Sequence, residues 1–118
     1  SQLKLDNLIV LIDKNSWQAM GRTSEILPSV FPAWVTHDKF HGWYVRGCNG
    51  HDYDLMAEFI LNEPKRLKEI GVAPQPICFR FETIKGKGVK MFEDKILFHY
   101  RHVDLETFNK AMEELNNA

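Results

Sequence analysis

A nearly unbroken apolar run close to the start of the sequence sets the first limit on the fold. Residues 7–13 read NLIVLID and are rich in β-branched side chains. A run of this kind suits a strand that is buried on both faces of a parallel sheet. The sequence therefore predicts that the chain is organised around such a strand.

Strand and helix patterns alternate along the rest of the chain. Further strands are predicted at 42–48 and 75–84, and helices are predicted at four places: 23–27, 52–62, 64–70 and about 104–115. Residues 14–21 and 83–89 have the composition of loops, and Pro32 allows a helix in 29–40 only near its first turn. We predict one α/β domain over 1–118, a partial domain with a parallel sheet and flanking helices.

Charge and composition exclude several function classes. The 118 residues include 15 basic and 16 acidic side chains, so the chain lacks the basic excess typical of nucleic-acid or anionic-membrane surfaces. No apolar run approaches the roughly 18 residues that would span a bilayer. Residues 1–6 are polar and lack a signal-peptide core. Cys48 and Cys78 lie in apolar strands, so we expect reduced, buried thiols in a cytoplasmic protein.

The predicted sheet is thin. A parallel sheet needs cover on both faces, and the few predicted helices barely provide it. The free edge of the first strand would be a template for pairing with another chain. We therefore expect a partner chain to add strands there.

Polar residues follow the predicted strands at 13–17, 49–52 and 83–99, and ligands of open α/β sheets bind beyond the carboxyl ends of strands. The Asn15 amide oxygen is a hard neutral ligand that suits Mg²⁺ together with a backbone carbonyl such as that of Trp17. The alternative is that Asn15 is simply a turn residue.

The segment TIKGKG at 83–88 combines glycines, which allow close backbone approach to a phosphate, with lysines. It matches neither a Walker motif nor GxGxxG, and a solvated surface turn is the alternative. His99 is able to donate a proton or stabilise an oxyanion, although a structural histidine would have the same pattern.

Three segments together resemble the transketolase family. They are LDNLIVLIDKNSWQAMG at 5–21, FHGWYVRGCNGHD at 40–52 and FETIKGKGVKMFEDKILFH at 81–99. They follow the family's order at compatible spacings, and they resemble the second half of its N-terminal domain, which binds the diphosphate of thiamine diphosphate. Phe98 stands where the family has tryptophan.

The resemblance implies a set of roles. Asn15 would supply a side-chain ligand to Mg²⁺ (or Ca²⁺), and Trp17 a backbone carbonyl ligand. Lys85 would lie near thiamine diphosphate, and His99 would contact the diphosphate and assist proton transfer. The implied reaction moves a two-carbon ketol unit from a ketose, such as a sugar phosphate, to an aldose or aldehyde.

The sequence also departs from the family. It lacks the GDG segment that carries the acidic metal ligand, and the pyrimidine-binding domain with its activating glutamate. Met20 and Asn49 stand where aspartates are common. The chain is thus expected to be a subunit or fragment of a split enzyme whose other chains supply the missing parts. Two alternatives remain: a non-catalytic assembly module that pairs with a full-length transketolase-like partner, and a related thiamine enzyme with another product.

Overall fold

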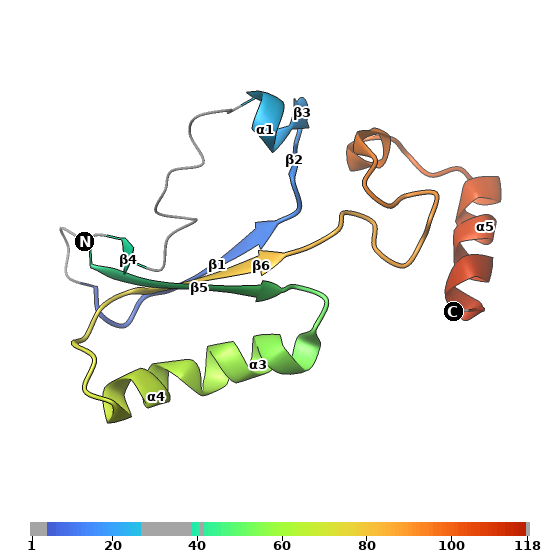
Figure 1. Cartoon of the computed structure of the whole chain (residues 1–118). Coiled ribbons are helices and arrows are strands. Elements are labelled where there is room, and N and C mark those ends of the chain that lie inside the picture. The colour runs from blue at the N-terminus through green and yellow to red at the C-terminus, as the bar shows by residue number, and fades with distance from the viewer. Residues whose placement is uncertain (1–4, 27–38, 41, 118) are drawn as a thin grey trace. The chain divides into compact units, whose positions relative to one another are not determined.

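The computed structural model describes residues 5–26, 39–40 and 42–117 (Figure 1). The chain forms two compact units, each built from two stretches of sequence. The first comprises Ser1–Lys14 and Ser29–Glu82, and the second comprises Asn15–Pro28 and Thr83–Ala118. The prediction of a single partial domain over 1–118 stays a prediction.

The first unit contains the predicted parallel sheet. Its strand order is β1-β6-β5-β4. The three parallel strands are β1 (Ile9–Lys14), β6 (Ile77–Glu82) and β5 (Trp43–Asn49). The short β4 (Lys39–Phe40) pairs antiparallel with β5. The predicted α/β class with a parallel sheet is confirmed. The rest of segment 29–40, where Pro32 limited a helix, lies outside the described residues.

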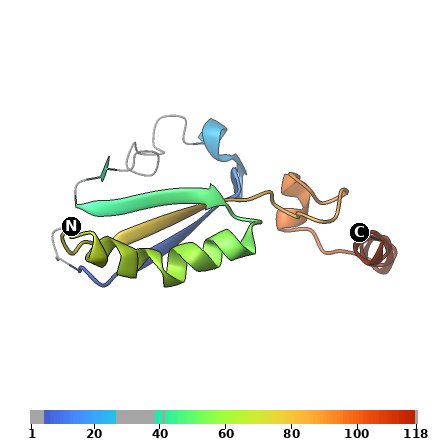
Figure 2. The ribbon, with the colours of Figure 1, turned by 60° about the horizontal axis from the view of Figure 1, so that its bottom comes forward.

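Two consecutive helices lie along one face of this sheet, as Figures 1 and 2 show. In α3 (Tyr53–Leu61) the Asp52 side chain accepts a hydrogen bond from the Leu55 N–H at 3.0 Å, which caps the first turn. The next helix, α4 (Glu63–Glu69), has proline in its first turn and is followed by Gly71 at φ +76°. Both helices were predicted within one or two residues.

The core of the first unit lies between these helices and the central strand β6. Its buried members come from α3, α4 and β6: Phe59, Leu67, Ile77, Phe79 and Phe81. Alternate residues of β6 point to this face, so the strand buries three of them against the helices. Val45 and Cys78 are also buried, whereas the Cys48 side chain is only half-buried, contrary to the expectation for both thiols.

Strand β1 is incompletely covered. In the described part of the chain it pairs only with β6, in the register Ile9↔Ile77 and Leu11↔Phe79. Residues paired in this way share a face of the sheet, yet Ile9 is 40% exposed and Leu11 53% exposed, whereas Phe79 is fully buried. An apolar strip on the helix-bearing face thus remains open at the edge strand.

The second unit begins with a tight hairpin that the sequence did not predict. Residues 14–21 were expected to be a loop, but β2 (Trp17–Gln18) and β3 (Gly21–Arg22) pair antiparallel, and α1 (Thr23–Ile26) follows. Strands of two residues carry no apolar alternation, so no periodicity reveals them. The unit also contains η1 (Ile96–His99), a 3₁₀ helix, and α5 (Leu105–Asn116), whose cap Asp104 accepts from the Thr107 N–H at 2.8 Å.

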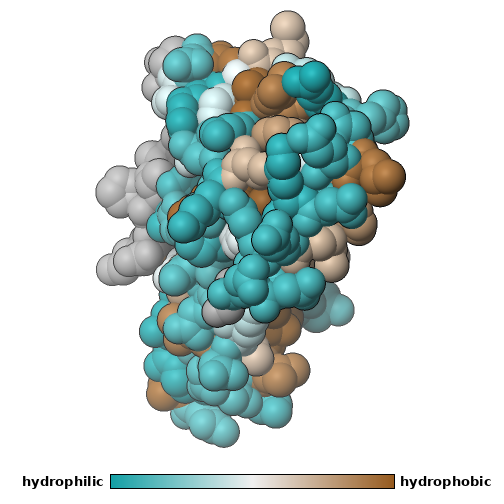
Figure 3. Space-filling model, turned by 90° about the vertical axis from the view of Figure 1, so that its right-hand side faces the viewer, coloured by the Kyte–Doolittle hydropathy of each residue, from teal (hydrophilic) through white to brown (hydrophobic). Residues whose placement is uncertain are grey.

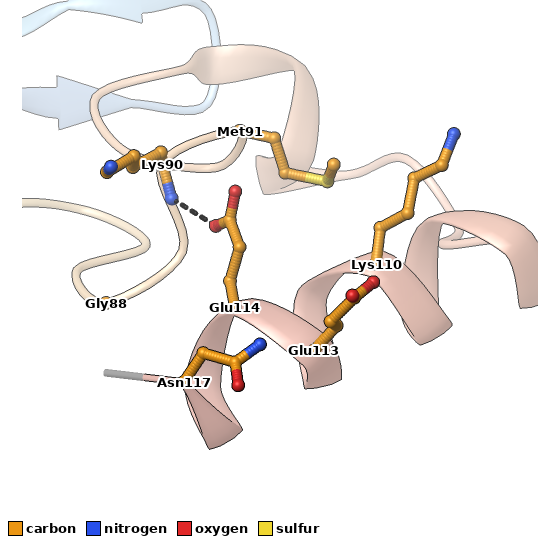
Figure 4. A pocket seen from close by; sticks show the side chains of 7 residues that line it. All are labelled: Gly88, Lys90, Met91, Lys110, Glu113, Glu114 and Asn117. Carbon is orange, nitrogen blue, oxygen red and sulfur yellow. Dashed lines mark hydrogen bonds between the residues drawn. The ribbon is translucent and has the colours of Figure 1, made fainter.

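The glycine-containing loop at 83–95 is ordered by its own turns. Gly86 has φ +73°, and a Cβ placed there would lie 2.7 Å from the backbone oxygen of Phe92. This close approach is available only to glycine. The loop is also joined to α5, because the Lys90 N–H donates to Glu114 at 2.8 Å beside a shallow hollow between them (Figure 4).

Candidate functional site

All four sequence-predicted site residues lie in the second unit. Asn15 and Trp17 belong to its first stretch, and Lys85 and His99 belong to its second. The other strand-end segment, 49–52, has a local structural role in the first unit. There Asn49 accepts from the His51 N–H at 3.0 Å, and Asp52 caps α3.

Asn15 forms the turn that leads from β1 into β2. Its side-chain oxygen accepts a hydrogen bond from the Trp17 N–H at 3.0 Å, and Ser16 between them has φ +67°. This is an Asx turn, the structural alternative weighed for the residue. A carbonyl oxygen has two lone pairs, so one hydrogen bond leaves capacity for a metal ion. The turn therefore leaves the predicted metal role possible, and that role stays a prediction.

Trp17 reaches across the unit to the second stretch of chain. Its indole N–H donates to Asp94 Oδ1 at 2.7 Å. Arg22 of β3 binds the same carboxylate, with Nη1 at 3.3 Å from Oδ1 and Nη2 at 2.6 Å from Oδ2. The Arg22 guanidinium also stacks over the Trp17 ring, 4.3 Å from its centroid. The Arg22 hydrogen bonds, and then that of Trp17, hold the pKa of Asp94 below its ordinary value.

Asp94 also contacts Lys85 through the backbone. The Asp94 N–H donates to the Lys85 carbonyl at 2.9 Å, and Asp94 itself has φ +55°. The structure thus brings the Asn15–Trp17 turn and the Lys85 segment together through one residue. Sequence reasoning missed both Asp94 and Arg22, because they lie 72 positions apart and no local pattern links them.

His99 lies at the end of η1 and is exposed. Its ring meets that of Tyr100 edge to face, with centroids 6.1 Å apart. The neighbouring Phe98, which stands where the family has tryptophan, packs against Phe92 at 4.4 Å between ring centroids. His99 is therefore available to a ligand or a partner, and its proposed role awaits a test.

The donors at the Asn15 turn fit only part of a metal site. An amide oxygen and a backbone carbonyl are neutral, hard ligands of the kind Mg²⁺ and Ca²⁺ accept, but such sites usually include a carboxylate. Within residues 5–26, 39–40 and 42–117, no group of three or more His, Cys, Asp or Glu is placed to hold a metal ion. The Asp94 carboxylate is already engaged by Arg22 and Trp17. A complete metal site would therefore need a further anionic ligand.

The architecture defines the general class of protein. It is an α/β chain with polar turns beyond the carboxyl ends of parallel strands, where ligands of such sheets bind. The helices of the described ranges include none that is long and apolar enough to cross a membrane. No protein-family model matches the sequence.

Curated relatives place the chain more narrowly. It is 32% identical over 114 residues to the 6-deoxy-6-sulfo-D-fructose transketolase subunit SqwG of Clostridium sp. (strain MSTE9), covering 95% of this chain and 38% of the relative. It is 31% identical over 119 residues to an apulose-4-phosphate transketolase subunit of Phocaeicola vulgatus, covering 98% of this chain and 38% of the relative. The corresponding protein of Actinobacillus succinogenes is 30% identical over 117 residues, covering 99% of this chain and 39% of the relative.

The chain belongs to the transketolase family. It spans less than two fifths of the length of these relatives. The observed sheet with its flanking helices is consistent with part of a transketolase-type fold.

Proposed function

We propose that this chain contributes to a thiamine diphosphate-dependent, transketolase-like transferase, in which it helps to bind the magnesium-diphosphate end of the cofactor. The observation that carries the proposal is the meeting of the Asn15–Trp17 turn with the Lys85 segment at Asp94. The relatives named as transketolase subunits support the reaction class. The reaction would move a two-carbon ketol unit from a ketose to an aldose or aldehyde.

The residues of this chain would divide the work. The Asn15 side-chain oxygen and the Trp17 carbonyl would hold Mg²⁺ (or Ca²⁺), and the Lys85 ammonium would add a positive charge near the phosphates. His99 would contact the diphosphate and hold or release a proton at the donor's hydroxyl group. When bound, thiamine diphosphate supplies the electron sink for breaking the carbon–carbon bond of the ketose.

The proposal includes other polypeptide segments. The Asn15 turn needs an anionic ligand to complete a metal site, because its own donors are a neutral amide oxygen and a backbone carbonyl. In the described residues β1 is an edge strand, whose backbone groups can pair with a further strand, and cover added there would bury the exposed Ile9 and Leu11 side chains. We propose that partner chains supply the acidic ligand, the strands beside β1 and the pyrimidine-binding domain.

The open edge also favours a second candidate, a non-catalytic assembly module. Its uncovered apolar side chains would serve assembly equally well whether or not cofactor binds. Hydrophobic side chains also reach the surface between hydrophilic ones on the face shown in Figure 3. The two candidates differ in one respect, since only the enzyme needs the Asn15 amide oxygen for a metal ion in addition to its hydrogen bond in the turn.

A reconstitution experiment tests the proposal. The chain is purified with its co-expressed partner chains, and binding of thiamine diphosphate is titrated with and without Mg²⁺. Product analysis then follows transfer from a ketose phosphate to several aldehydes. We expect metal-dependent binding and turnover in the full mixture only, and a full mixture that binds no thiamine diphosphate with Mg²⁺ refutes the enzyme.

The variant Asn15→Ala separates the two candidates. The enzyme predicts a loss of Mg²⁺-dependent binding of about 10-fold or more, since one of the few metal ligands is gone. The assembly module predicts an unchanged complex with unchanged activity. Asn117→Ala is the matched control, because Asn117 is an exposed asparagine of the same unit that follows α5.

A further inference from the structure

The Asp94 carboxylate lies where three segments of the second unit meet. It accepts the Trp17 indole N–H at 2.7 Å from β2, and it accepts two N–H groups of Arg22 from β3. The backbone N–H of Asp94 donates to the Lys85 carbonyl at 2.9 Å in the glycine-containing loop. Both carboxylate oxygens are therefore used, and each partner comes from a different segment.

The hairpin that follows Asn15 and contains Trp17 is very short. Strands β2 and β3 contain two residues each, and α1 contains four. A two-stranded hairpin is marginally stable at best, even when its strands are longer. The contacts at Asp94 join this hairpin to a segment that lies more than 70 positions away in the sequence.

The geometry is more specific than that of an ordinary surface ion pair. The Arg22 side chain is 39% exposed and that of Asp94 51% exposed, so their charge attraction alone contributes little to stability. However, the Asp94 carboxylate accepts hydrogen bonds from both the Arg22 guanidinium and the Trp17 indole N–H, and the guanidinium stacks on the indole ring. These contacts fix the orientation of Trp17 more than they stabilise the fold.

We propose that Asp94 and Arg22 are positioning residues, which hold the Asn15–Trp17 turn against the Lys85 segment so that the diphosphate site is assembled before ligand binds. The inference rests on the proposed function, since it concerns the same site. In this role neither residue would touch the cofactor. They act through Trp17 and Lys85, in the same way that residues around a metal site orient the side chains that bind the metal ion.

Pre-assembly has a measurable consequence for binding. If the hydrogen bonds of the Asp94 carboxylate are weakened, the ligand must order the hairpin and the loop when it binds. The free energy needed for this ordering makes binding weaker. The apparent dissociation constant for Mg²⁺, measured with thiamine diphosphate present, should rise about 10-fold, the lower end of the effects seen for groups that orient metal ligands. The turnover number at saturating Mg²⁺ and cofactor should be nearly unchanged, because the reacting groups are intact.

The variant Asp94→Asn suits this test. Asparagine tolerates the positive φ of residue 94 and retains one oxygen for the Trp17 indole, but it cannot offer two anionic oxygens to Arg22. The matched control is Glu106→Gln, which removes a carboxylate of the same unit that pairs with Lys110 in α5. Thermal unfolding of the full chain should be similar for both variants.

Two measurements decide the inference. The first is tryptophan emission of the full chain without ligands, where subtraction of a Trp17→Phe variant isolates the Trp17 signal. The second is calorimetric titration of Mg²⁺ into the assembled complex with thiamine diphosphate. We expect Asp94→Asn to change the Trp17 emission and weaken Mg²⁺ binding, with full turnover recovered by excess Mg²⁺, whereas Glu106→Gln should change neither property.

Each outcome has one meaning. Unchanged Trp17 emission in Asp94→Asn, or unchanged Mg²⁺ affinity in a complex whose wild-type form binds normally, overturns the positioning role alone. A turnover number that stays low at saturating Mg²⁺ overturns it as well, because positioning through the ligands is relieved by excess metal. Failure of the wild-type complex to bind thiamine diphosphate overturns the proposed function and this inference with it.

Discussion

Replacing Glu63 with glutamine is the sharpest test of what stabilises the first unit. Glu63 is only 4% exposed, and its carboxylate accepts hydrogen bonds from Tyr44, from Arg46 at 2.7 Å and from Arg66 at 2.7 and 2.8 Å. Charged partners on both sides favour the ionised form of a buried carboxyl. The Arg66 hydrogen bonds are the largest cause of the lowering of the Glu63 pKa to about 2.

The magnitude follows from this pKa. The ordinary value is 4.5, and a tenfold change in proton affinity corresponds to about 1.4 kcal/mol, so the network stabilises the folded chain by about 3 kcal/mol at neutral pH. Glutamine fills the same space but offers only one neutral oxygen, and the Arg46 and Arg66 guanidinium groups cannot accept from its NH₂ group. We expect Glu63→Gln to lower the free energy of unfolding by about 3 kcal/mol at pH 7, as for other broken buried ion pairs.

Urea unfolding of the full chain, followed by circular dichroism between pH 7 and pH 2, measures this loss. Because the Glu63 pKa is lowered in the folded state, its contribution is complete above 4.5 and is lost as the pH falls toward 2. The difference between wild type and Glu63→Gln should therefore shrink as the pH is lowered. Glu58→Gln is the control, since that carboxylate of α3 is exposed and accepts a hydrogen bond from the Asn62 side chain.

Two results would contradict this reasoning. A loss below about 1 kcal/mol at pH 7, the size expected of a surface pair, would mean that the buried network contributes no more than exposed charges do. A difference that stays constant between pH 7 and pH 2 would mean that the cost comes from altered packing and not from the charge of Glu63.

Two further predictions concern the loop and the sheet edge. Gly86→Ala should disorder the glycine-containing loop and lower the free energy of unfolding by more than about 1 kcal/mol, because the new Cβ meets the Phe92 backbone at a positive φ. Amide hydrogen exchange at residues 85–95 measures the disorder, and intact protection there would contradict the prediction. Leu11→Lys should leave the isolated chain folded, since Leu11 is half exposed, but it should weaken assembly with partner chains by about 10-fold or more, as measured by analytical ultracentrifugation. Leu61→Lys on α3 is the control at an exposed leucine. If Leu11→Lys assembled as well as this control, the docking of strands at β1 would be contradicted.

The sequence was most informative where burial imposes a periodicity. The apolar run at 7–13 and the helical spacing at 52–62 predicted β1 and α3 closely, because strands and helices that face a core repeat their apolar residues. The hairpin β2–β3 was missed because its strands are too short to show any repeat. Segment 29–40 was left open, and most of it lies outside the described residues.

The candidate site was predictable only in part, for a different reason. Asn15 and Lys85 were found because they follow strands in segments that resemble a known family. Asp94 and Arg22 carry no such mark, since a carboxylate and a guanidinium 72 positions apart are two ordinary surface charges until the fold brings them together. The glycines of segment 83–88 were predicted to allow close approach to a phosphate, which stays a prediction, whereas the close approach of the Phe92 backbone to Gly86 was not foreseen.

The pairing of β1 with β6 explains how distant segments come to share one unit. These strands are parallel and in register at Lys14↔Glu82, and the Lys14 ammonium lies 2.9 Å from the Glu82 carboxylate. Asn15 and Thr83 continue directly from these paired residues, so the two stretches of the second unit both begin at the same end of the sheet. Antiparallel pairing would send one of them to the opposite end. A substitution that shifts the β1–β6 register should therefore separate Asn15 from Lys85 even though neither residue is altered.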